Sequence, residues 1–309
     1  MNLAGIEIGG TKLQVVLGND RGAIHKRISH TIKAQEGASK IRRLIEHDLS
    51  QLGQLDAIGV GFGGPVNRNT GEVWTSYHVE GWTGFNIREW LHGLTGAVVA
   101  LENDANVAAL GESIVGAGKD HRVVFYVTLG SGVGGGLCIE KEIYHGQLPG
   151  EVEFGHIRLD KSGRIVQEMC SGWAVNERVL EAAALYKESK LSELAKLHPG
   201  AEAKALLPAM EAGDPEAKQI FDGTVSDLAF GLSHITHLFH PDTIIIGGGL
   251  SMIGEVLRKR VEDNVRDFIM DAFQPGPLIQ LSRLGTDVVP VGALLLASGE
   301  LKKQLWKTL

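Results

Sequence analysis

The sequence predicts an α/β protein made of two related lobes, each with a mixed sheet flanked by helices, and a cleft between the lobes. Three glycine clusters, among 41 glycines, each follow an apolar, strand-like run. Two of the clusters form the turns of strand-turn-strand units that open the two halves of the chain, which indicates an internal duplication. A length of 309 residues suffices for two domains. We expect a smaller lobe over 1–117 and 290–309, and a larger lobe over 118–289.

Residue patterns predict the elements of the first half in order. Alternating apolar residues around the first glycine turn predict a hairpin with strands at 3–8 and 13–17. Apolar residues at helical spacing predict a helix over 40–52, since Ile41, Leu44, Ile45 and Leu49 share one face. Short apolar runs predict strands over 57–62 and 97–100. A helix over 105–115 follows, with Asn103 or Asp104 as its N-cap.

The second half repeats the hairpin and then becomes mainly helical. The repeated hairpin joins strands at 123–129 and 136–139. The Gly213-Asp214-Pro215 turn predicts the start of a long helix, because proline is favoured in a first helical turn. The remaining expected elements are helices over 173–195, 201–212, 215–236, 252–268 and 293–305, and a strand over 243–246.

The composition excludes several classes of protein. Hydrophobic residues make up 43% and charged residues 22%, and the mean hydropathy is +0.02, as in ordinary globular proteins. A net charge of −7 argues against nucleic acid as a partner. Two cysteines, Cys138 and Cys170, give neither a disulfide framework nor a four-thiolate zinc site. The sequence has no signal-peptide pattern and no apolar run of about 20 residues, so we expect a cytoplasmic protein without a membrane span.

Polar residues stand at the end of the strand expected over 97–100. The segment Glu102-Asn103-Asp104-Ala105-Asn106 places carboxylates and amides where ligands collect in α/β proteins. We therefore interpret Asp104 as a general base for phosphoryl transfer. The alternative is that Asp104 only caps the following helix.

The glycine clusters are candidate nucleotide loops. Backbone N–H groups in such turns bind anions, and Thr11 and Lys12 add a hydroxyl and a cation to the first cluster. Two matching turns can hold the phosphates of one nucleotide, and the third cluster, Gly247-Gly248-Gly249, leaves room for a flat adenine ring. The alternative for each cluster is a tight turn without a ligand. None matches a P-loop or a dinucleotide-binding fingerprint.

Together these motifs resemble the ROK family of sugar kinases, within the actin-like ATPase superfamily. The resemblance covers essentially the whole chain, and the order and spacing of the motifs carry it. It implies the two-lobed actin-like ATPase fold, also called ribonuclease H-like, and the use of ATP and Mg²⁺. The matching segments are Glu7-Ile8-Gly9-Gly10-Thr11-Lys12, Gly63-Gly64-Pro65, Glu102-Asn103-Asp104-Ala105-Asn106, 128–136, Glu153-Phe154-Gly155-His156, Ser171-Gly172 and Gly247-Gly248-Gly249.

The resemblance also implies a role for each matching residue. Asp104 accepts the proton of the sugar hydroxyl that attacks the γ-phosphate of ATP, and Asn103 binds sugar hydroxyls beside it. Carboxylates and amides suit a hexose, because its hydroxyls both donate and accept hydrogen bonds. The other implied sugar ligands are Gly63, Gly64, Glu153, His156 and Glu168. The implied nucleotide ligands are Gly9, Gly10, Thr11, Lys12, Gly130, Ser131, Gly132, Gly247, Gly248 and Gly249.

One departure from the family concerns zinc. ROK proteins usually carry a cysteine cluster just after Glu-x-Gly-His, which holds a structural zinc together with the histidine. Here residues 158–168 contain no cysteine, and Cys170 alone cannot form the site. We therefore expect no zinc, which leaves His156 as a sugar ligand. The alternative is a histidine without a ligand.

Three further departures leave the sugar and metal contacts open. Gln167 stands where the family has a sugar-binding glutamate, so either Gln167 replaces it or Glu168, one residue later, serves instead. Glu7 replaces an aspartate that faces Mg²⁺, and we expect the longer side chain to reach the ion through water. His78 stands where the family tends to have asparagine ahead of Gly81-Trp82.

The resemblance leaves three functions to distinguish. The first is ATP-dependent phosphorylation of a hexose, with a glucose-like aldohexose as the substrate. The second is sugar sensing without catalysis, as in the repressors of the family. The third is a hexose kinase with another donor such as polyphosphate, which would favour a basic track that the scattered lysines and arginines do not form. The partners expected are a sugar and a nucleotide, and a second copy of the chain, since the family commonly forms homodimers.

Overall fold

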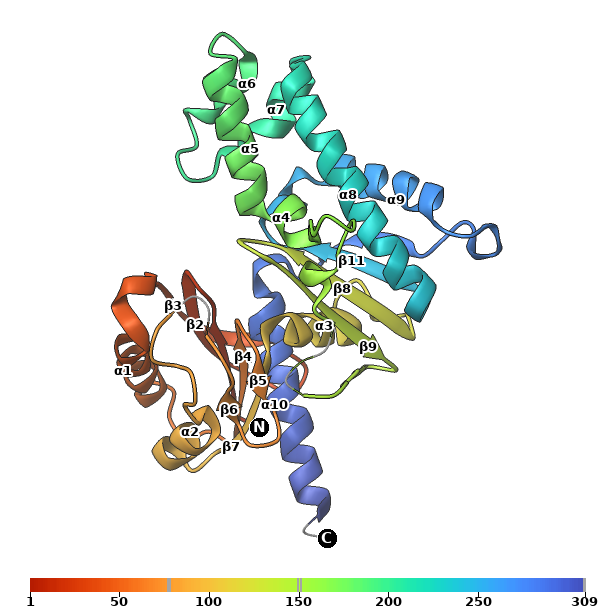
Figure 1. Cartoon of the computed structure of the whole chain (residues 1–309). Helices are drawn as coiled ribbons and strands as arrows, with labels where there is room; N and C mark the ends of the chain where they lie inside the picture. Colours follow the sequence, from red (N-terminus) through yellow and green to blue (C-terminus); the bar gives the residue numbers. More distant parts are fainter. Residues whose placement is uncertain (77–78, 149, 151, 308–309) are drawn as a thin grey trace. The chain divides into compact units, whose positions relative to one another are not determined.

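The computed structural model describes residues 1–76, 79–148, 150 and 152–307, so that His78 lies outside the described residues (Figure 1). The described strands are β1 Leu3–Ile8, β2 Lys12–Gly18, β3 Ile24–Thr31, β4 Ala57–Phe62, β5 Val66–Asn67, β6 Glu72–Val73, β7 Val98–Asn103, β8 Val123–Leu129, β9 Val133–Ile139, β10 Glu142–Ile143, β11 Thr243–Gly247 and β12 Leu278–Leu281. The α-helices are α1 Gly37–Ser50, α2 Ile87–Thr95, α3 Asp104–Ile114, α4 Val166–Cys170, α5 Gly172–Leu185, α6 Lys190–Ala195, α7 Leu206–Glu211, α8 Pro215–Phe239, α9 Glu255–Phe268 and α10 Val288–Lys307. The 3₁₀ helices are η1 Ala34–Glu36, η2 Phe154–His156, η3 Glu202–Ala205, η4 Gly249–Ile253, η5 Asp271–Phe273 and η6 Gly285–Asp287.

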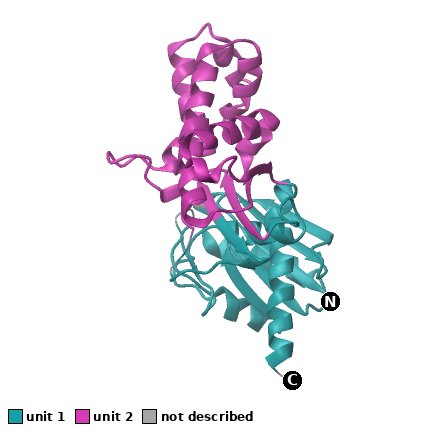
Figure 2. Cartoon of the chain, turned by 90° about the vertical axis from the view of Figure 1, so that its right-hand side faces the viewer, with its two compact units in different colours: residues 1–121, 136–151, 283–309 teal, residues 122–135, 152–282 magenta. Residues whose placement is uncertain are grey.

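The chain divides into two compact units (Figure 2). Unit 1 comprises residues 1–121, 136–151 and 283–309. Unit 2 comprises residues 122–135 and 152–282. Strand β9 begins in unit 2 and ends in unit 1.

The sheet of unit 1 has the strand order β3-β2-β1-β4-β7. Strands β1, β2 and β3 are antiparallel neighbours, and β4 runs parallel to both β1 and β7. The expected first hairpin is confirmed by the β1–β2 pairing. Because β1, β4 and β7 run in the same direction, their carboxyl ends lie at one edge of the sheet, where ligands collect in α/β folds.

The two faces of this sheet pack differently. Ala4, Ile6 and Ile8 of β1 join the large apolar cluster to which α1 and α2 contribute. On the other face, Leu3 packs with Leu294 of α10. Where α10 crosses this face, the strands carry glycine. A Cβ at Gly59 would lie 1.9 Å from the carbonyl oxygen of Ala293. The glycines therefore let α10 approach the backbone of the sheet directly.

The second sheet has the strand order β10-β9-β8-β11-β12. Strand β11 runs parallel to β8 and to β12, as β4 runs parallel to β1 and β7. Both sheets thus place a hairpin beside two further parallel strands, which agrees with the expected duplication. The prediction of an α/β protein with mixed sheets and flanking helices is confirmed.

Three helix predictions are wrong in detail. The single helix expected over 173–195 is broken after Leu185, because Ser189 begins a new helix by accepting the N–H of Ser192 at 3.0 Å. The helix expected over 201–212 is a 3₁₀ turn followed by α7. The helix expected from residue 252 begins only at Glu255, after Gly254 with a φ of 81°.

Both thiols are inaccessible. Cys138 lies on β9 and Cys170 ends α4, and both side chains are fully buried. Burial raises the pKa of Cys138 to about 12 and raises the pKa of Cys170 as well. In the part of the chain that the structure describes, no helix is long and apolar enough to cross a membrane.

Candidate active site

The loop between β7 and α3 carries the candidate base. Asn103 is the N-cap of α3, and its side-chain oxygen accepts the N–H groups of Ala105 at 2.9 Å and Asn106 at 3.3 Å. Its amide nitrogen donates to the carbonyl oxygen of Gly64 at 3.3 Å. Asp104 is the first residue of the helix, where the aligned N–H groups favour a negative charge. The capping function therefore belongs to Asn103 and not to Asp104.

The first glycine turn and the Gly63-Gly64 turn meet at Asp104. The N–H of Gly9 donates to the carbonyl of Lys12 at 2.9 Å, and the N–H of Gly63 donates to the carbonyl of Ile8 at 2.9 Å. A Cβ placed on Gly63 would lie 3.3 Å from Asp104 Oδ2 and 3.5 Å from the Cα of Gly9. Unit 1 thus brings together the turn predicted to bind phosphate, the turn predicted to bind sugar and the predicted base.

Glu7 ends a network of polar side chains beside this turn. Its Oε2 accepts Nε2 of Gln14 at 2.6 Å and lies 3.3 Å from Nζ of Lys12. Lys12 Nζ also donates to the carbonyl of Thr286 at 3.3 Å, just before α10. The carboxylate of Glu7 is a hard oxygen ligand of the kind that Mg²⁺ prefers.

Unit 2 holds the second glycine turn, residues 130–132, at the end of β8. The N–H of Gly130 donates to the carbonyl of Gly132 at 3.0 Å, and the N–H of Gly172 donates to the carbonyl of Gly130 at 2.7 Å. Gln167 supports the same turn, because its Oε1 accepts the N–H of Val133 at 3.1 Å. A Cβ on Gly132 would lie 2.7 Å from that oxygen, so a side chain at this position would displace the end of Gln167.

The remaining predicted sugar ligands follow in unit 2. Glu153 precedes η2, and His156 ends it. Desolvation by the surrounding protein raises the pKa of the Glu153 carboxyl, although the residue as a whole is exposed, and the nearby His156 opposes the shift. Glu168 is also exposed and accepts the N–H of Ile165 at 3.4 Å.

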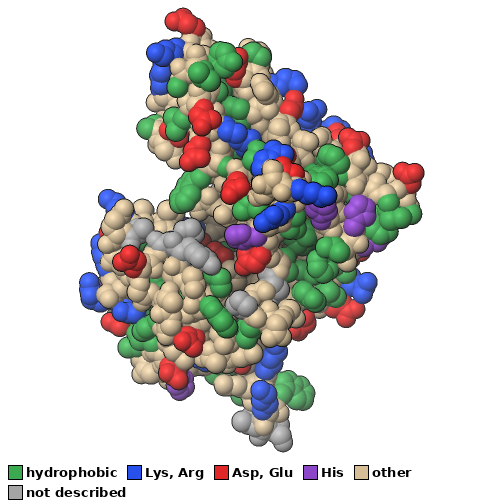
Figure 3. Space-filling view, viewed as in Figure 1, with side chains coloured by type: hydrophobic (Ala, Val, Ile, Leu, Met, Phe, Trp, Pro, Cys, Tyr) green, Lys and Arg blue, Asp and Glu red, His purple; other side chains and the backbone are tan. Residues whose placement is uncertain are grey.

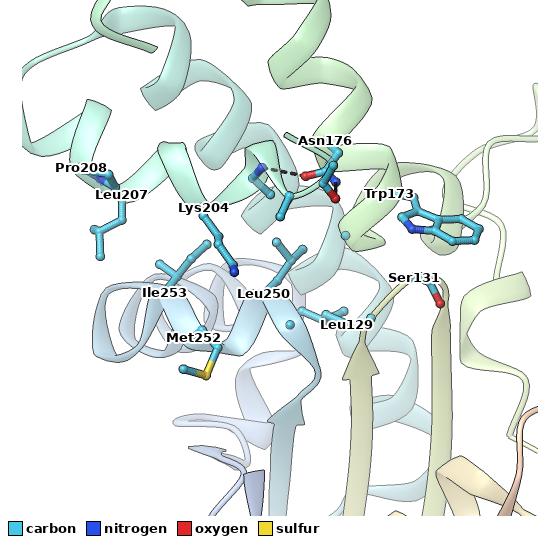
Figure 4. A pocket seen from close by; sticks show the side chains of 16 residues that line it. Leu129, Ser131, Trp173, Asn176, Lys204, Leu207, Pro208, Leu250, Met252 and Ile253 are labelled. Carbon is cyan, nitrogen blue, oxygen red and sulfur yellow. Dashed lines mark hydrogen bonds between the residues drawn. The ribbon is translucent and has the colours of Figure 1, made fainter. Parts of the chain in front are cut away.

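A cavity of about 450 Å³ opens beside the second glycine turn (Figure 4). Its wall includes Gly249 of the third glycine cluster, where Gly248 has a φ of 81° and a Cβ at Gly248 would lie 2.5 Å from the backbone of Leu129. The lining is mainly apolar, so the cavity suits a flat, hydrophobic ring. It is lined by Leu129, Gly130, Ser131, Gly172, Trp173, Asn176, Gly200, Ala201, Ala203, Lys204, Leu207, Pro208, Gly249, Leu250, Met252 and Ile253.

Known proteins resemble this chain in sequence. The sequence profile of the ROK family matches residues 3–300. The chain belongs to the ROK family. The glucokinase of Thermotoga maritima is a relative, 30% identical over 304 residues that cover 95% of this chain and 96% of that protein.

Solved ROK structures share the fold. The ROK family glucokinase from Streptomyces griseus, in complex with glucose and AMPPNP, matches with a TM-score of 0.84 and 27% identity, over 97% of this chain and 100% of that chain. A ROK family transcriptional regulator, a homologue of the E. coli MLC protein, also reaches a TM-score of 0.84, at 20% identity, over 99% of this chain and 80% of its own. The prediction of the actin-like ATPase fold is confirmed.

Sequence reasoning missed much of the cavity in this ROK protein. Trp173, Asn176 and Lys204 line it but belong to no glycine cluster. Asn176 is fixed by the N–H of Ala203, which donates to its Oδ1 at 2.6 Å (Figure 4). The sequence offered one signal for the cavity, the large aromatic residue Trp173 directly after Ser171-Gly172. In the structure this residue is half-exposed and stays outside the core.

The residues in the region of the ROK family zinc site do not fit zinc. Among residues 1–76, 79–148, 150 and 152–307, no group of three or more histidine, cysteine or acidic side chains is placed to hold a metal ion. The hairpin around Asp160 is instead closed by hydrogen bonds to its carboxylate from Ser162 Oγ at 2.5 Å, the Gly163 N–H at 3.1 Å and Arg164 Nε at 2.6 Å. Ionic and hydrogen-bonding contacts thus hold the segment between His156 and Gln167.

Proposed function

We propose that this ROK protein phosphorylates a hexose, most readily a glucose-like aldohexose, with ATP as donor and Asp104 as general base. The observation that carries the proposal is the meeting of Asp104, Gly63 and the Gly9 turn in unit 1. The glucokinase relatives support a sugar as the acceptor. A carboxylate beside an anion-binding turn is the arrangement that a hydroxyl nucleophile and a γ-phosphate require.

The site residues divide the work of the proposed reaction. Asp104 takes the proton of the attacking hydroxyl, and Asn103 with the Gly63-Gly64 backbone orients the sugar. Glu153, His156 and Glu168 bind further hydroxyls. The two glycine turns, residues 9–12 and 130–132, bind phosphates, although the N–H groups of Gly9 and Gly130 already donate within these turns. The cavity beside Gly247-Gly248-Gly249 binds the adenine. In the sugar and phosphate contacts, hydrogen-bond donors of the protein meet acceptors of the substrate, and acceptors meet donors.

The carboxylates of unit 1 fit Mg²⁺, but those that the structure describes form no all-protein cage. Glu7, next to the phosphate turn, and Asp104 are oxygen donors of the type this ion binds, usually together with waters and substrate phosphates. Glu7 would hold the ion through water. When bound, Mg²⁺ neutralises charge on the transferred phosphate.

An ADP-release assay tests the proposal. Mg-ATP is mixed with the protein and, in turn, glucose, mannose, fructose, allose, N-acetylglucosamine and N-acetylmannosamine, with a sugar-free control. Sugar-dependent ADP formation supports the proposal and names the acceptor. A sugar that raises the melting temperature without any turnover instead supports a sugar sensor.

The same assay with polyphosphate in place of ATP tests the other donor. A polyanion requires a continuous basic surface. On the face in Figure 3, basic and acidic side chains are interspersed. A homodimer and a cytoplasmic location remain predictions, and light scattering on the purified protein measures the first.

Replacing Gly248 by alanine is expected to weaken binding of a non-hydrolysable ATP analogue about tenfold or more, because the new side chain displaces the cavity wall at Leu129 and Gly249. The new Cβ would force a residue with a φ of 81° against the backbone of Leu129, which lines the cavity. Gly223→Ala, in α8, is the control, because a Cβ there meets nothing within 4 Å and the residue does not line the cavity. Calorimetry measures both variants, and equal affinities would contradict the assignment of the cavity.

Acidification is expected to weaken sugar binding through Glu153. Its raised pKa means that the carboxylate, which accepts hydrogen bonds from sugar hydroxyls, becomes protonated nearer to neutral pH than an ordinary glutamate does. Because the pKa is higher in the folded state, protonation of Glu153 itself favours folding. Asp160, Asp214 and Asp222 have lowered pKa values, so their protonation opposes folding. Thermal unfolding at each pH therefore accompanies the binding measurement. The sugar Kd is measured against pH for the wild type and Glu153→Gln, and the variant should show a flatter profile.

A further inference from the structure

Glu102 is a buried acidic residue one position before the sugar-binding Asn103 of the proposed site. It is 4% exposed, at the end of β7. Its Oε1 accepts the N–H of Asn103 at 2.8 Å and Nδ2 of Asn106 at 3.2 Å. Its Oε2 pairs with Nε2 of His145 at 2.8 Å. A carboxylate removed from water in this way needs such partners to remain charged.

The hydrogen bonds of Glu102 fix the residues on both sides of Asp104. Asn103 precedes Asp104 and Asn106 follows it by two positions, and both are bonded to the same carboxylate oxygen. Asn103 in turn caps α3. The orientation of Glu102 therefore sets the first turn of the helix from which the Asp104 carboxylate projects.

His145 is held in place from two sides. Tyr144, the residue before His145, donates its N–H to the carbonyl of Leu137 on β9 at 2.8 Å. Gly146, the residue after it, accepts Nη2 of Arg68 with its carbonyl at 3.2 Å. Because an ionised carboxylate only accepts hydrogen bonds, Nε2 of His145 carries the proton toward Glu102. The backbone on both sides of His145 is therefore hydrogen-bonded, and its imidazole, 35% exposed, faces the buried carboxylate of Glu102.

We propose that His145 is a positioning residue for phosphoryl transfer, acting on Asp104 through Glu102; this inference rests on the proposed function. Without the imidazole N–H, Oε2 of Glu102 loses its donor, and the carboxylate turns away to find another. The hydrogen bonds to Asn103 and Asn106 then loosen, and Asp104 leaves the geometry in which it meets the attacking hydroxyl. A misplacement of about 1 Å at a reacting centre can cost up to about a hundredfold in rate.

The test compares three variants of the full chain. His145→Ala removes the donor, and His145→Gln restores an N–H at the end of a side chain of similar reach. His47→Ala is the matched control, because His47 is an exposed histidine of unit 1 whose Nε2 lies 2.8 Å from Nε2 of Gln51. For each variant we would measure kcat, the KM for sugar and for ATP, and the melting temperature.

The inference predicts that His145→Ala lowers kcat about tenfold or more and raises the KM for sugar, which Asn103 binds, while the KM for ATP stays near that of the wild type. The melting temperature should fall, because the buried carboxylate of Glu102 loses a partner. His145→Gln should recover most of the rate, and His47→Ala should match the wild type. A kcat for His145→Ala equal to that of His47→Ala overturns the inference alone, as does a glutamine variant as slow as the alanine variant. A wild type without sugar-dependent ADP formation overturns the proposed function, and this inference with it.

Discussion

Asp104→Asn is expected to lower kcat for sugar phosphorylation by about 10² to 10⁴-fold, the range that a general base supplies. The asparagine keeps the size and polarity of the side chain but does not accept the proton of the sugar hydroxyl. The KM for sugar should change little, because Asn103 and the Gly63-Gly64 backbone remain. The melting temperature should fall only slightly, since Asn103 and not Asp104 caps α3 and the charge of Asp104 at the helix N-terminus is worth about 0.3–1 kcal/mol. ADP release and thermal unfolding are measured on the same preparation.

Asp120→Asn is the control for this experiment. It removes the same charge from a side chain that is 82% exposed and belongs to unit 1. A surface change of this kind usually alters stability by less than about 0.5 kcal/mol. If Asp104→Asn retained a rate comparable to that of Asp120→Asn, the assignment of Asp104 as the base would be wrong.

Gly292→Ala is expected to destabilise the protein by roughly 1–3 kcal/mol, as overpacking of a close contact does. A Cβ on Gly292 would lie 1.9 Å from the carbonyl oxygen of Val107, where α10 crosses α3. The two helices must separate to admit it, and neither backbone can yield as a side chain can. The midpoint of denaturant unfolding measures the effect.

Gly299→Ala gives the matched comparison within the same helix. No heavy atom outside the helix's own neighbourhood lies within 4 Å of a Cβ at this position. The substitution should stabilise the helix by about 0.5–1 kcal/mol, because alanine loses less backbone entropy than glycine does. Two variants with the same change of side chain should thus shift the midpoint in opposite directions. A destabilisation by Gly299→Ala as large as that by Gly292→Ala would contradict the packing account.

The elements with a strong local pattern could be predicted from the sequence. Strand β4 was predicted at the bounds that the structure has, because its residues form a short apolar run and Gly63-Gly64-Pro65 marks the turn after it. All six residues of the strand are buried. Strand β3 was not predicted, since its sequence Ile24-His25-Lys26-Arg27-Ile28-Ser29-His30-Thr31 is polar, as suits the edge of a sheet. Its place is fixed by pairing with β2, which no local pattern reveals.

The candidate site divides in the same way. The glycine turns and the Asp104 loop have local signatures, because positive φ, close backbone approach and helix capping restrict which residues can stand there. The cavity does not, because Trp173, Lys204 and Met252 come from three separate segments that only tertiary packing brings together. Gln167 shows a further limit. The sequence left open whether Gln167 or Glu168 is the sugar ligand, and in the structure the amide oxygen of Gln167 bonds to the backbone after the glycine turn.

The burial of Cys138 and Cys170 makes the native chain suitable for site-specific labelling. Maleimide reagents react with thiolates, and two thiols that are shielded from solvent and have raised pKa values supply almost none. A cysteine introduced on the exposed surface of each unit would therefore carry a fluorophore or spin label without removal of the native residues. Distances between such labels, read with and without sugar and nucleotide, would report directly how the two units are arranged in solution.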